Sequence, residues 1–143
     1  MTVPVGLYLA DTSAIVRASK SDAVRDRLVD LANQELLATC VTIDLELGYS
    51  ARTPAEHYAI ATQRSELLID LPLVDQIGDR ARVVQSMLAA SSQHRAAGAF
   101  DLLTAAIAEY HGATVLHYDA DFDHIATITG QPTEWIAPRG SLA

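Results

Sequence analysis

Apolar and polar positions alternate along the chain in blocks that predict strands separated by helices. Apolar runs at residues 5–9, 36–41, 68–74 and 113–116 predict four strands, and Glu134-Trp135-Ile136 is expected to form a fifth strand at the edge of the sheet. Between them, apolar residues recur every three or four positions, as at Val24, Leu28 and Leu31, which is typical of a helix buried along one face. The predicted helices cover residues 22–32, 43–51, 54–67, 76–91, 101–111 and 121–129. This alternation predicts an α/β layer fold with a mostly parallel sheet.

Several predicted helices begin or end at residues that favour helix termini. Ser21 and Thr42 each precede a predicted helix and can accept a hydrogen bond from its first turn. The segment Thr53-Pro54-Ala55-Glu56 has the form of a capping box with proline at the first helical position. Gly112 follows the helix that ends at His111, as glycine commonly does.

Carboxylates stand directly after two of the predicted strands. Asp11 follows the first strand, and Asp119 follows the strand at 113–116, with Asp121 two positions further on. The carboxyl ends of parallel strands meet at one edge of the sheet, where open α/β sheets bind their ligands. Asp101 opens a helix that runs back along the sheet, so its carboxylate is expected at the same edge, and a simple N-cap is the alternative. Asp123 is expected to be a solvated helix residue.

The helix after the second strand offers two candidates for a further site carboxylate. Glu46 is one turn into this helix and shares a face with Thr42, Tyr49 and Ser50. Asp44 is in the first turn on the other side, where the helix dipole favours a solvent-facing carboxylate. We prefer Glu46 as the site residue, and the spacing leaves Asp44 open as the alternative.

The composition indicates one compact domain covering residues 1–143. Half of the residues are apolar and a fifth are charged, which is enough for a sizeable core. No apolar run is long enough for a membrane span, and no basic segment precedes an apolar one at the N-terminus. We therefore expect no membrane association, no signal peptide and a cytoplasmic location. The single cysteine, Cys40, is expected to be a buried, unreactive thiol.

The net charge of −8 restricts how the chain can bind nucleic acid. Proteins that bind nucleic acid through surface charge are usually basic, so either nucleic acid is not a partner or bound cations bridge the acidic groups to phosphate. Two carboxylates about 5 Å apart repel each other by about 3 kcal/mol at an effective dielectric constant near 20. Protonation or a divalent cation relieves this repulsion, and oxygen-only ligands suit Mg²⁺ or Mn²⁺.

The histidines do not have the spacing of a metal-binding motif. His94 and Arg95 lie in the polar loop before Asp101. They are residues either of a solvated loop or of a contact to phosphate or RNA.

Four segments carry a resemblance to a known family: Leu9–Ala14, Glu46–Arg52, Phe100–Ala106 and His117–Asp123. In this order and spacing they resemble the acidic motifs of PIN-domain ribonucleases, and specifically of the VapC toxins of bacterial toxin–antitoxin pairs. The resemblance extends over essentially the whole chain. Gly48 departs from it, since a bulkier apolar residue is common there.

The resemblance implies a three-layer α/β/α sandwich with a five-stranded sheet and a Mg²⁺- or Mn²⁺-dependent endoribonuclease. It also implies a homodimer and a VapB-type antitoxin that blocks the site. Glu46 would orient or activate the attacking water, and Ser13 would support the site through its hydroxyl. The residues implied to hold the metal are Asp11, Asp101 and Asp119, with Asp121 as an auxiliary.

Four other readings use the same acidic edge. A receiver domain would need a lysine after the last strand, and the only lysine is Lys20. A haloacid-dehalogenase-type phosphatase would need Asp-x-Asp after the first strand, where this chain has Asp11-Thr12-Ser13. A non-catalytic binding module with the same fold, and a PIN nuclease that processes RNA outside toxin–antitoxin systems, stay open as alternatives.

Overall fold

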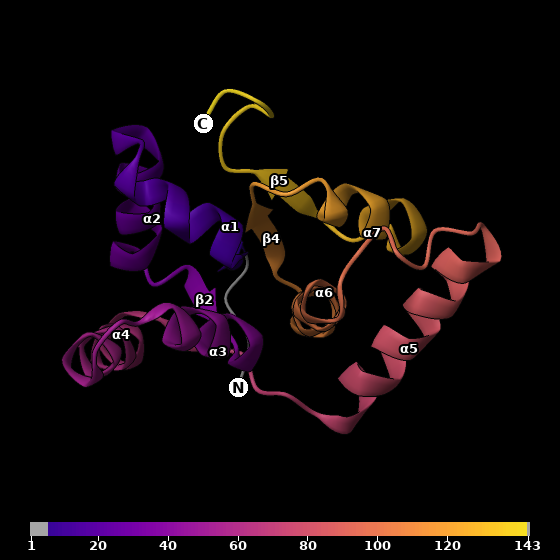
Figure 1. The fold of residues 1–143 in the computed structure, drawn as a ribbon, viewed down its shortest axis with the longest axis horizontal. Helices are drawn as coiled ribbons and strands as arrows, with labels where there is room; N and C mark the ends of the chain where they lie inside the picture. Colours follow the sequence, from indigo (N-terminus) through magenta and orange to yellow (C-terminus); the bar gives the residue numbers. More distant parts are fainter. Residues whose placement is uncertain (1–5, 143) are drawn as a thin grey trace.

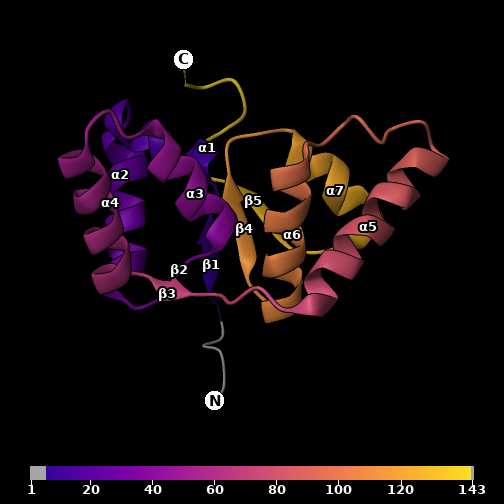
Figure 2. The same ribbon diagram turned by 60° about the horizontal axis from the view of Figure 1, so that its bottom comes forward.

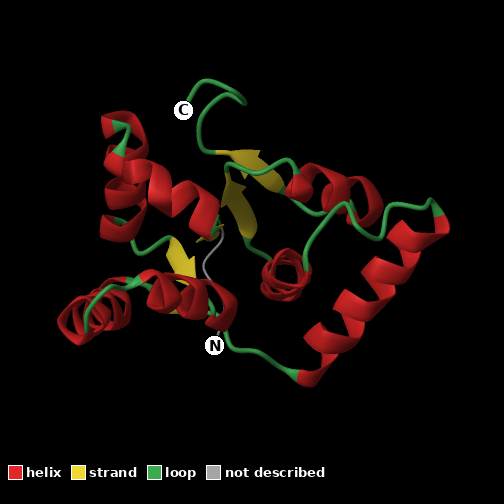
Figure 3. Cartoon of the chain, viewed as in Figure 1, coloured by secondary structure: helices red, strands yellow, loops and turns green. Residues whose placement is uncertain are grey.

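The fold is a five-stranded parallel sheet covered by helices on both faces, as the sequence predicts. A computed structural model describes residues 6–142 of the chain. The strands are β1 (Tyr8–Ala10), β2 (Leu37–Thr39), β3 (Ile69–Asp70), β4 (Thr114–His117) and β5 (Thr133–Trp135). The α-helices are α1 (Thr12–Ile15), α2 (Asp22–Asn33), α3 (Val41–Ser50), α4 (Pro54–Leu67), α5 (Asp75–Ala90), α6 (Ala99–His111) and α7 (Asp121–Thr129), and a 3₁₀ turn, η1, covers Val16–Ser19. Figures 1 and 3 show these helices surrounding the short strands.

The strand order is β3-β2-β1-β4-β5, and every neighbouring pair is parallel. The chain therefore builds the sheet outward from β1 in one direction through β2 and β3, then crosses back to place β4 on the other side of β1. Such a reversal is a topological switch point, where the connections leave the carboxyl ends of two adjacent strands on opposite faces and open a crevice. The crevice is expected at the ends of β1 and β4, which are followed by Asp11 and Asp119.

Alternating strand residues serve two separate cores. Leu7, Leu9 and Val115 pack with residues of α3, α5, α6 and α7 on one face of the sheet. Ala10 and Leu116 pack with residues of α1 and α2 on the other face. Figure 2 shows α4 at one side of the molecule and α5 at the other, with the strands between them. None of the helices within residues 6–142 is long and apolar enough to cross a membrane.

The predicted helices agree closely with the structure where local capping governs them. The Ser21 hydroxyl accepts the N–H of Val24, and the Thr53 hydroxyl accepts the N–H of Glu56. The Glu56 carboxylate, however, accepts from the N–H of Arg52 rather than closing the capping box on Thr53. Gly112 ends α6 in the left-handed conformation, with φ 72°.

Two predicted helix starts were wrong. Thr42 and Asp101 both lie inside their helices, where their side chains make contacts with other elements. The helix α3 begins at Val41 with Cys40 at the N-cap, and Thr42 is instead buried, with its hydroxyl 2.6 Å from that of Thr104. The helix α6 begins at Ala99 after Gly98, so Asp101 lies in the first turn and is not the N-cap.

Strand bounds differ more than helix bounds. The predicted third strand, residues 68–74, shrinks to Ile69–Asp70, and the last ladder bond runs from Leu71 N–H to the Thr39 carbonyl. Pro72 follows and has no N–H to continue the ladder. The first strand is Tyr8–Ala10 instead of residues 5–9, and Val5 lies outside the described residues.

Candidate metal centre

Asp11 lies immediately after β1, at the edge of the sheet where the switch point predicts a binding site. Its side chain is 4% exposed and accepts the N–H of Ser13 at 3.0 Å, which makes Asp11 the N-cap of α1. Burial raises the pKa of Asp11, hydrogen bonds from Ser13 oppose this, and the charge of Asp119 raises it further. The Ser13 hydroxyl in turn accepts the N–H of Tyr118 at 2.9 Å. Ser13 thus connects the end of β1 to the end of β4.

Three further aspartates meet beside Asp11. Asp101 in the first turn of α6, Asp119 after β4 and Asp121 at the start of α7 each offer a carboxylate oxygen within 4.8 Å of the other two. The Oδ1 atom of Asp119 also accepts the N–H of Asp121 at 2.9 Å. The three side chains are partly buried, so solvent screens their mutual repulsion only in part.

The electrostatics of this group favour either a shared proton or a bound cation. Burial, a hydrogen bond with Asp121 and the charges of Asp11, Asp119 and Asp121 raise the pKa of Asp101 to about 8. Without a cation, Asp101 and its hydrogen-bonded neighbour Asp121 therefore share a proton near neutral pH. A carboxylic acid in a cluster of carboxylates is the expected result when like charges cannot all ionise.

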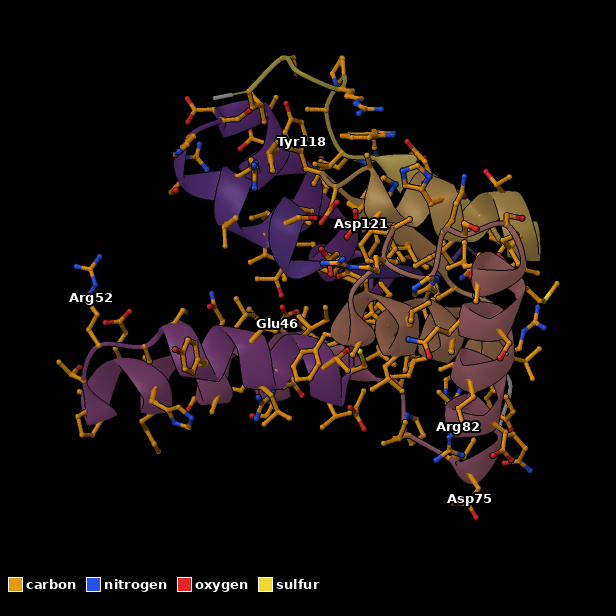
Figure 4. All side chains as sticks on the ribbon, turned by 45° about the vertical axis from the view of Figure 1, so that its right-hand side comes forward. Glu46, Arg52, Asp75, Arg82, Tyr118 and Asp121 are labelled. Carbon is orange, nitrogen blue, oxygen red and sulfur yellow. The ribbon has the colours of Figure 1, made fainter. Side chains whose placement is uncertain are left out.

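Glu46 approaches Asp11 from α3. Its Oε1 atom accepts the Thr12 hydroxyl at 3.0 Å, so the residue that follows Asp11 holds Glu46 in place. Burial raises the pKa of Glu46, the Thr12 hydrogen bond opposes this, and the charge of Asp11 raises it again. Figure 4 shows Glu46 and Asp121 near the centre of the molecule, whereas Arg52, just beyond the C-terminal end of α3, lies away from both.

Asp44 is directed elsewhere, which separates it from Glu46. Its Oδ1 atom accepts the Thr39 hydroxyl at 2.6 Å, and its Oδ2 atom lies 3.6 Å from Nε of Arg64. With a side chain only 18% exposed, Asp44 ties α3 to β2 and α4. The prediction that Asp44 faces solvent was therefore wrong. Its carboxylate accepts a hydrogen bond from Thr39 in β2 and forms an ion pair with Arg64 in α4.

Asp123 was also expected to be solvated, and this was wrong. Both of its carboxylate oxygens lie 3.2 Å from the indole Nε1 of Trp135, which donates to them from β5. The sequence contains no local signal for this pairing, since the two residues belong to different elements. Arg95 is exposed in the loop between α5 and α6, as is His94.

His117 contacts the site, and its role there was not predicted from the sequence. It ends β4, is fully buried, and its Nδ1 atom lies 3.2 Å from the backbone N–H of Asp119. Burial lowers the pKa of His117, which keeps the ring neutral although Asp123, Asp11 and Asp119 oppose this shift. The sequence does contain a signal for this role: a histidine stands at the end of an apolar strand, directly before the acidic motif.

The donor set suits a hard divalent cation. All of the side chains that converge here offer carboxylate oxygens, the ligands that Mg²⁺ and Mn²⁺ prefer. Ligands around Mg²⁺ lie roughly 3–4 Å from one another, so oxygens within 4.8 Å need only small movements to bind one ion. The raised pKa of Asp101 agrees with this reading, because a cation would displace the proton and satisfy the same charges.

Known proteins are similar to this chain over nearly its whole length. A family model described as the PIN domain matches residues 8–128. Ribonuclease VapC21 of Mycobacterium tuberculosis is 43% identical over 134 residues, covering 94% of this chain and 96% of the relative. Ribonuclease VapC51 of the same organism is 45% identical over 141 residues, with the same coverage of each.

Solved structures have the same fold at low sequence identity. The VapBC2 structure from Rickettsia felis, bound to a promoter DNA fragment, has a TM-score of 0.73 and 19% identity, and covers 90% of this chain and 97% of its own. The DNA-bound VapBC structure from Salmonella typhimurium has a TM-score of 0.75 and 19% identity, with 93% and 100% covered.

Proposed function

The chain belongs to the PIN-domain family and groups with the VapC ribonucleases, and from this membership and its acidic site we propose that it is a Mg²⁺-dependent endoribonuclease, the toxin of a type II toxin–antitoxin pair. The observation that carries the proposal is the convergence of Asp101, Asp119 and Asp121 within 4.8 Å at the switch point of the sheet. Asp11 and Glu46 extend this group toward α1 and α3, since each of their pKa values responds to a neighbouring site carboxylate.

In this proposal Asp11, Asp101, Asp119 and Asp121 hold Mg²⁺, with Mn²⁺ as a substitute. When bound, the cation activates water and offsets negative charge on a phosphate oxygen. It also explains how a chain with a net charge of −8 attracts RNA.

Glu46 is proposed to take the proton of the attacking water. Its carboxylate is fixed by the Thr12 hydroxyl, and its raised pKa brings it closer to the value at which a base accepts a proton near neutral pH. Ser13 is proposed to support the site by joining Asp11 to the backbone of Tyr118. Arg95 is proposed as a phosphate contact at the rim, because it is exposed in the loop that leads to Asp101.

Two variants of the same helix test the catalytic part of the proposal. Glu46→Gln should reduce metal-dependent cleavage of cellular RNA by roughly 10²-fold or more, as expected for loss of a general base. Asp44→Asn, two residues away, should leave cleavage within about threefold of wild type, since its Oδ1 atom can still accept from Thr39. Cleavage that continues unchanged in chelator, or in the Glu46→Gln variant, would contradict the mechanism.

The identity of the RNA is a separate question with its own measurement. Mapping new 5′ ends in cellular RNA after brief expression would separate one defined cleavage site from general degradation. A non-catalytic binding module would produce no new ends. A PIN nuclease that processes RNA outside a toxin–antitoxin system would cut without arresting growth.

The proposed partner is a VapB-type antitoxin, and an apolar groove supports it. A groove of about 200 Å³ runs between α2 and α4, with Leu28, Val29, Ile60 and Leu67 among its walls. Leu47, the residue after Glu46, also lines the groove. The antitoxin is proposed to lay an apolar segment here and thereby cover the carboxylates, as VapBC complexes of the same fold support.

Matched charge insertions test this docking. Leu67→Glu in the groove should abolish binding of the antitoxin encoded beside this chain and leave RNA cleavage intact. Val83→Glu on α5 is the control, because the two side chains are similarly exposed, at 51% and 49%. Equal antitoxin binding by both variants would place the antitoxin elsewhere.

A homodimer and a cytoplasmic location complete the proposal. Val41, Leu45 and Tyr49 form an exposed apolar stripe along α3, 37%, 59% and 93% exposed, which a second copy would bury. Sedimentation of wild type and Leu45→Glu would measure this association, and equal sedimentation of the two would exclude this stripe as the interface.

A further inference from the structure

The backbone that carries two of the proposed metal ligands is held by side chains rather than by strand pairing. The pairing of β4 with β5 ends at His117, where the chain turns toward α7. After this point the N–H of Tyr118 donates to the Ser13 hydroxyl, and the N–H of Asp121 donates to Oδ1 of Asp119. Between them, the N–H of Asp119 donates to Nδ1 of His117 at 3.2 Å.

The His117 ring is fixed in an aromatic box. The ring of Phe122 in α7 lies with its centroid 5.1 Å away, and that of Trp135 in β5 lies 5.0 Å away. Trp135 is itself held by Asp123, to which its indole N–H donates. The imidazole therefore has little freedom to turn, and its Nδ1 atom stays directed at the Asp119 backbone.

The hydrogen bonding defines the tautomer. The donor to Nδ1 is a backbone N–H, so Nδ1 must carry a lone pair, and the proton of the neutral ring is on Nε2. Within the described part of the chain, Nε2 is buried without a hydrogen-bond partner. An unpaired buried donor is unfavourable, and an apolar ring would avoid it. Among residues 6–142, the one polar contact of the imidazole is the bond to Asp119, which is therefore the contact that requires a histidine.

We propose that His117 is a positioning residue for the metal centre: its Nδ1 atom holds the Asp119 backbone and so sets where the carboxylates of Asp119 and Asp121 point. The bond acts on both ligands, because Asp119 also receives the N–H of Asp121. With Oδ1 of Asp119 accepting this bond, the other carboxylate oxygen of Asp119 is available to a cation. This inference rests on the proposed metal-dependent function, which it deepens.

Three substitutions separate the hydrogen bond from the filling of the box. His117→Phe keeps a ring and removes the acceptor. His117→Asn keeps an acceptor close to the position of Nδ1, whereas His117→Gln moves the amide to the position of Nε2. His124→Asn is the matched control, since His124 is exposed on α7 and lies outside the box.

Calorimetric titration with Mn²⁺ alone is the first measurement, on variants whose folding is checked by circular dichroism. The Phe and Gln variants should bind Mn²⁺ about 10–100-fold more weakly than wild type, as loss of groups that orient metal ligands usually causes. The Asn variant should recover affinity to within about threefold. Wild-type affinity in a folded Phe variant, or equal affinity of the Asn and Gln variants, would overturn the proposal.

A second measurement needs no metal and no variant. Nitrogen-15 NMR of the wild-type protein should show Nδ1 of His117 unprotonated and Nε2 protonated, with the Asp119 amide protected from exchange. A protonated Nδ1 would overturn the positioning role even if every variant failed to fold. Wild-type protein that does not bind Mn²⁺ but shows this tautomer would refute the proposed metal-dependent function and leave the Asp119 hydrogen bond established.

Discussion

Replacing Asp101 by asparagine should stabilise the metal-free protein while removing its response to divalent cations. Asp101 is the carboxylate with the most strongly raised pKa, about 8 against an ordinary value of 3.8. Between these pH values the native state holds a proton that the unfolded chain has released. Unfolding therefore releases a proton, and the free energy of unfolding of the wild type falls as the pH rises from about 4 to about 8.

The magnitude follows from the same pKa. The full displacement corresponds to about 6 kcal/mol, since one pH unit is worth 1.36 kcal/mol. A single pair of carboxylates 4.8 Å apart repels by about 3 kcal/mol at an effective dielectric constant of 20. Asp101 is partly exposed, and solvent screening together with the lost interaction with the α6 dipole reduces the gain to about 1–3 kcal/mol.

Urea unfolding in chelator, measured from pH 6 to pH 8.5, is the appropriate assay. Asp101→Asn should be more stable than wild type by an amount that grows with pH and levels off above about 8. Addition of Mn²⁺ to a hundred times its dissociation constant should stabilise wild type by about 2.7 kcal/mol and leave the variant unchanged. In Mn²⁺, wild type should therefore become as stable as Asp101→Asn or more stable.

The control removes a charge of the same sign from elsewhere on the surface. Asp30→Asn on α2 changes the net charge equally, and its exposed side chain lies outside the acidic site. It should show neither the pH-dependent gain nor the lost response to Mn²⁺. If Asp101→Asn were less stable than wild type at pH 8.5 in chelator, the carboxylates would not repel one another as the structure requires, and the reasoning would be refuted.

Three further predictions concern residues around the site. Thr104→Val removes the partner at 2.6 Å from the buried Thr42 hydroxyl and leaves it only the weak contact with the Cys40 thiol, so it should cost about 1–2 kcal/mol in urea unfolding. The double change with Thr42→Val should cost less than the sum of the two single changes. Gly48→Ala should raise stability by about 0.5–1 kcal/mol through helix propensity. The added Cβ would lie 3.2 Å from Nε2 of His57, whose exposed side chain can turn away, and a loss of stability would show that this ring is fixed. The Cys40 thiol, fully buried and with its pKa raised by burial, should react with a thiol reagent only after denaturation, and labelling of the native protein would contradict its burial.

The fold was predictable because its elements are specified locally. Ser21, Thr53 and Gly112 determine helix ends through contacts within a few residues, and the structure has these ends where the sequence predicts them. Predicted helix ends were wrong where a residue distant in the sequence contacts the expected cap. Thr42 has the chemistry of an N-cap but is engaged by Thr104, on a helix whose packing no local pattern reveals.

The candidate site was predictable to the same degree. Asp11 and Asp119 follow from strand ends, which a sequence shows directly. The choice between Glu46 and Asp44 depends on the rotation of α3, which is decided by Thr12 on one side and by Thr39 and Arg64 on the other. The spacing of Asp44 and Glu46 in the sequence shows that their side chains point to different sides of α3. It does not show which side faces the aspartates.

By itself, the sequence determined the alternation of strands and helices, the acidic residues at the strand ends and the family. These follow from periodicity and from the residue types that a strand, a cap or a cation requires, and each is a property of a short segment. Only the tertiary structure decided that β4 lies beside β1 and not beyond β3, so that Asp11 and Asp119 follow adjacent strands. It also turned Nδ1 of His117 toward the Asp119 backbone. Strand order depends on contacts between residues more than a hundred positions apart, such as the pairing of Leu9 with Val115 and the bond of Ser13 with Tyr118. The direction of the His117 ring depends on Phe122 and Trp135, which reach it from two other elements.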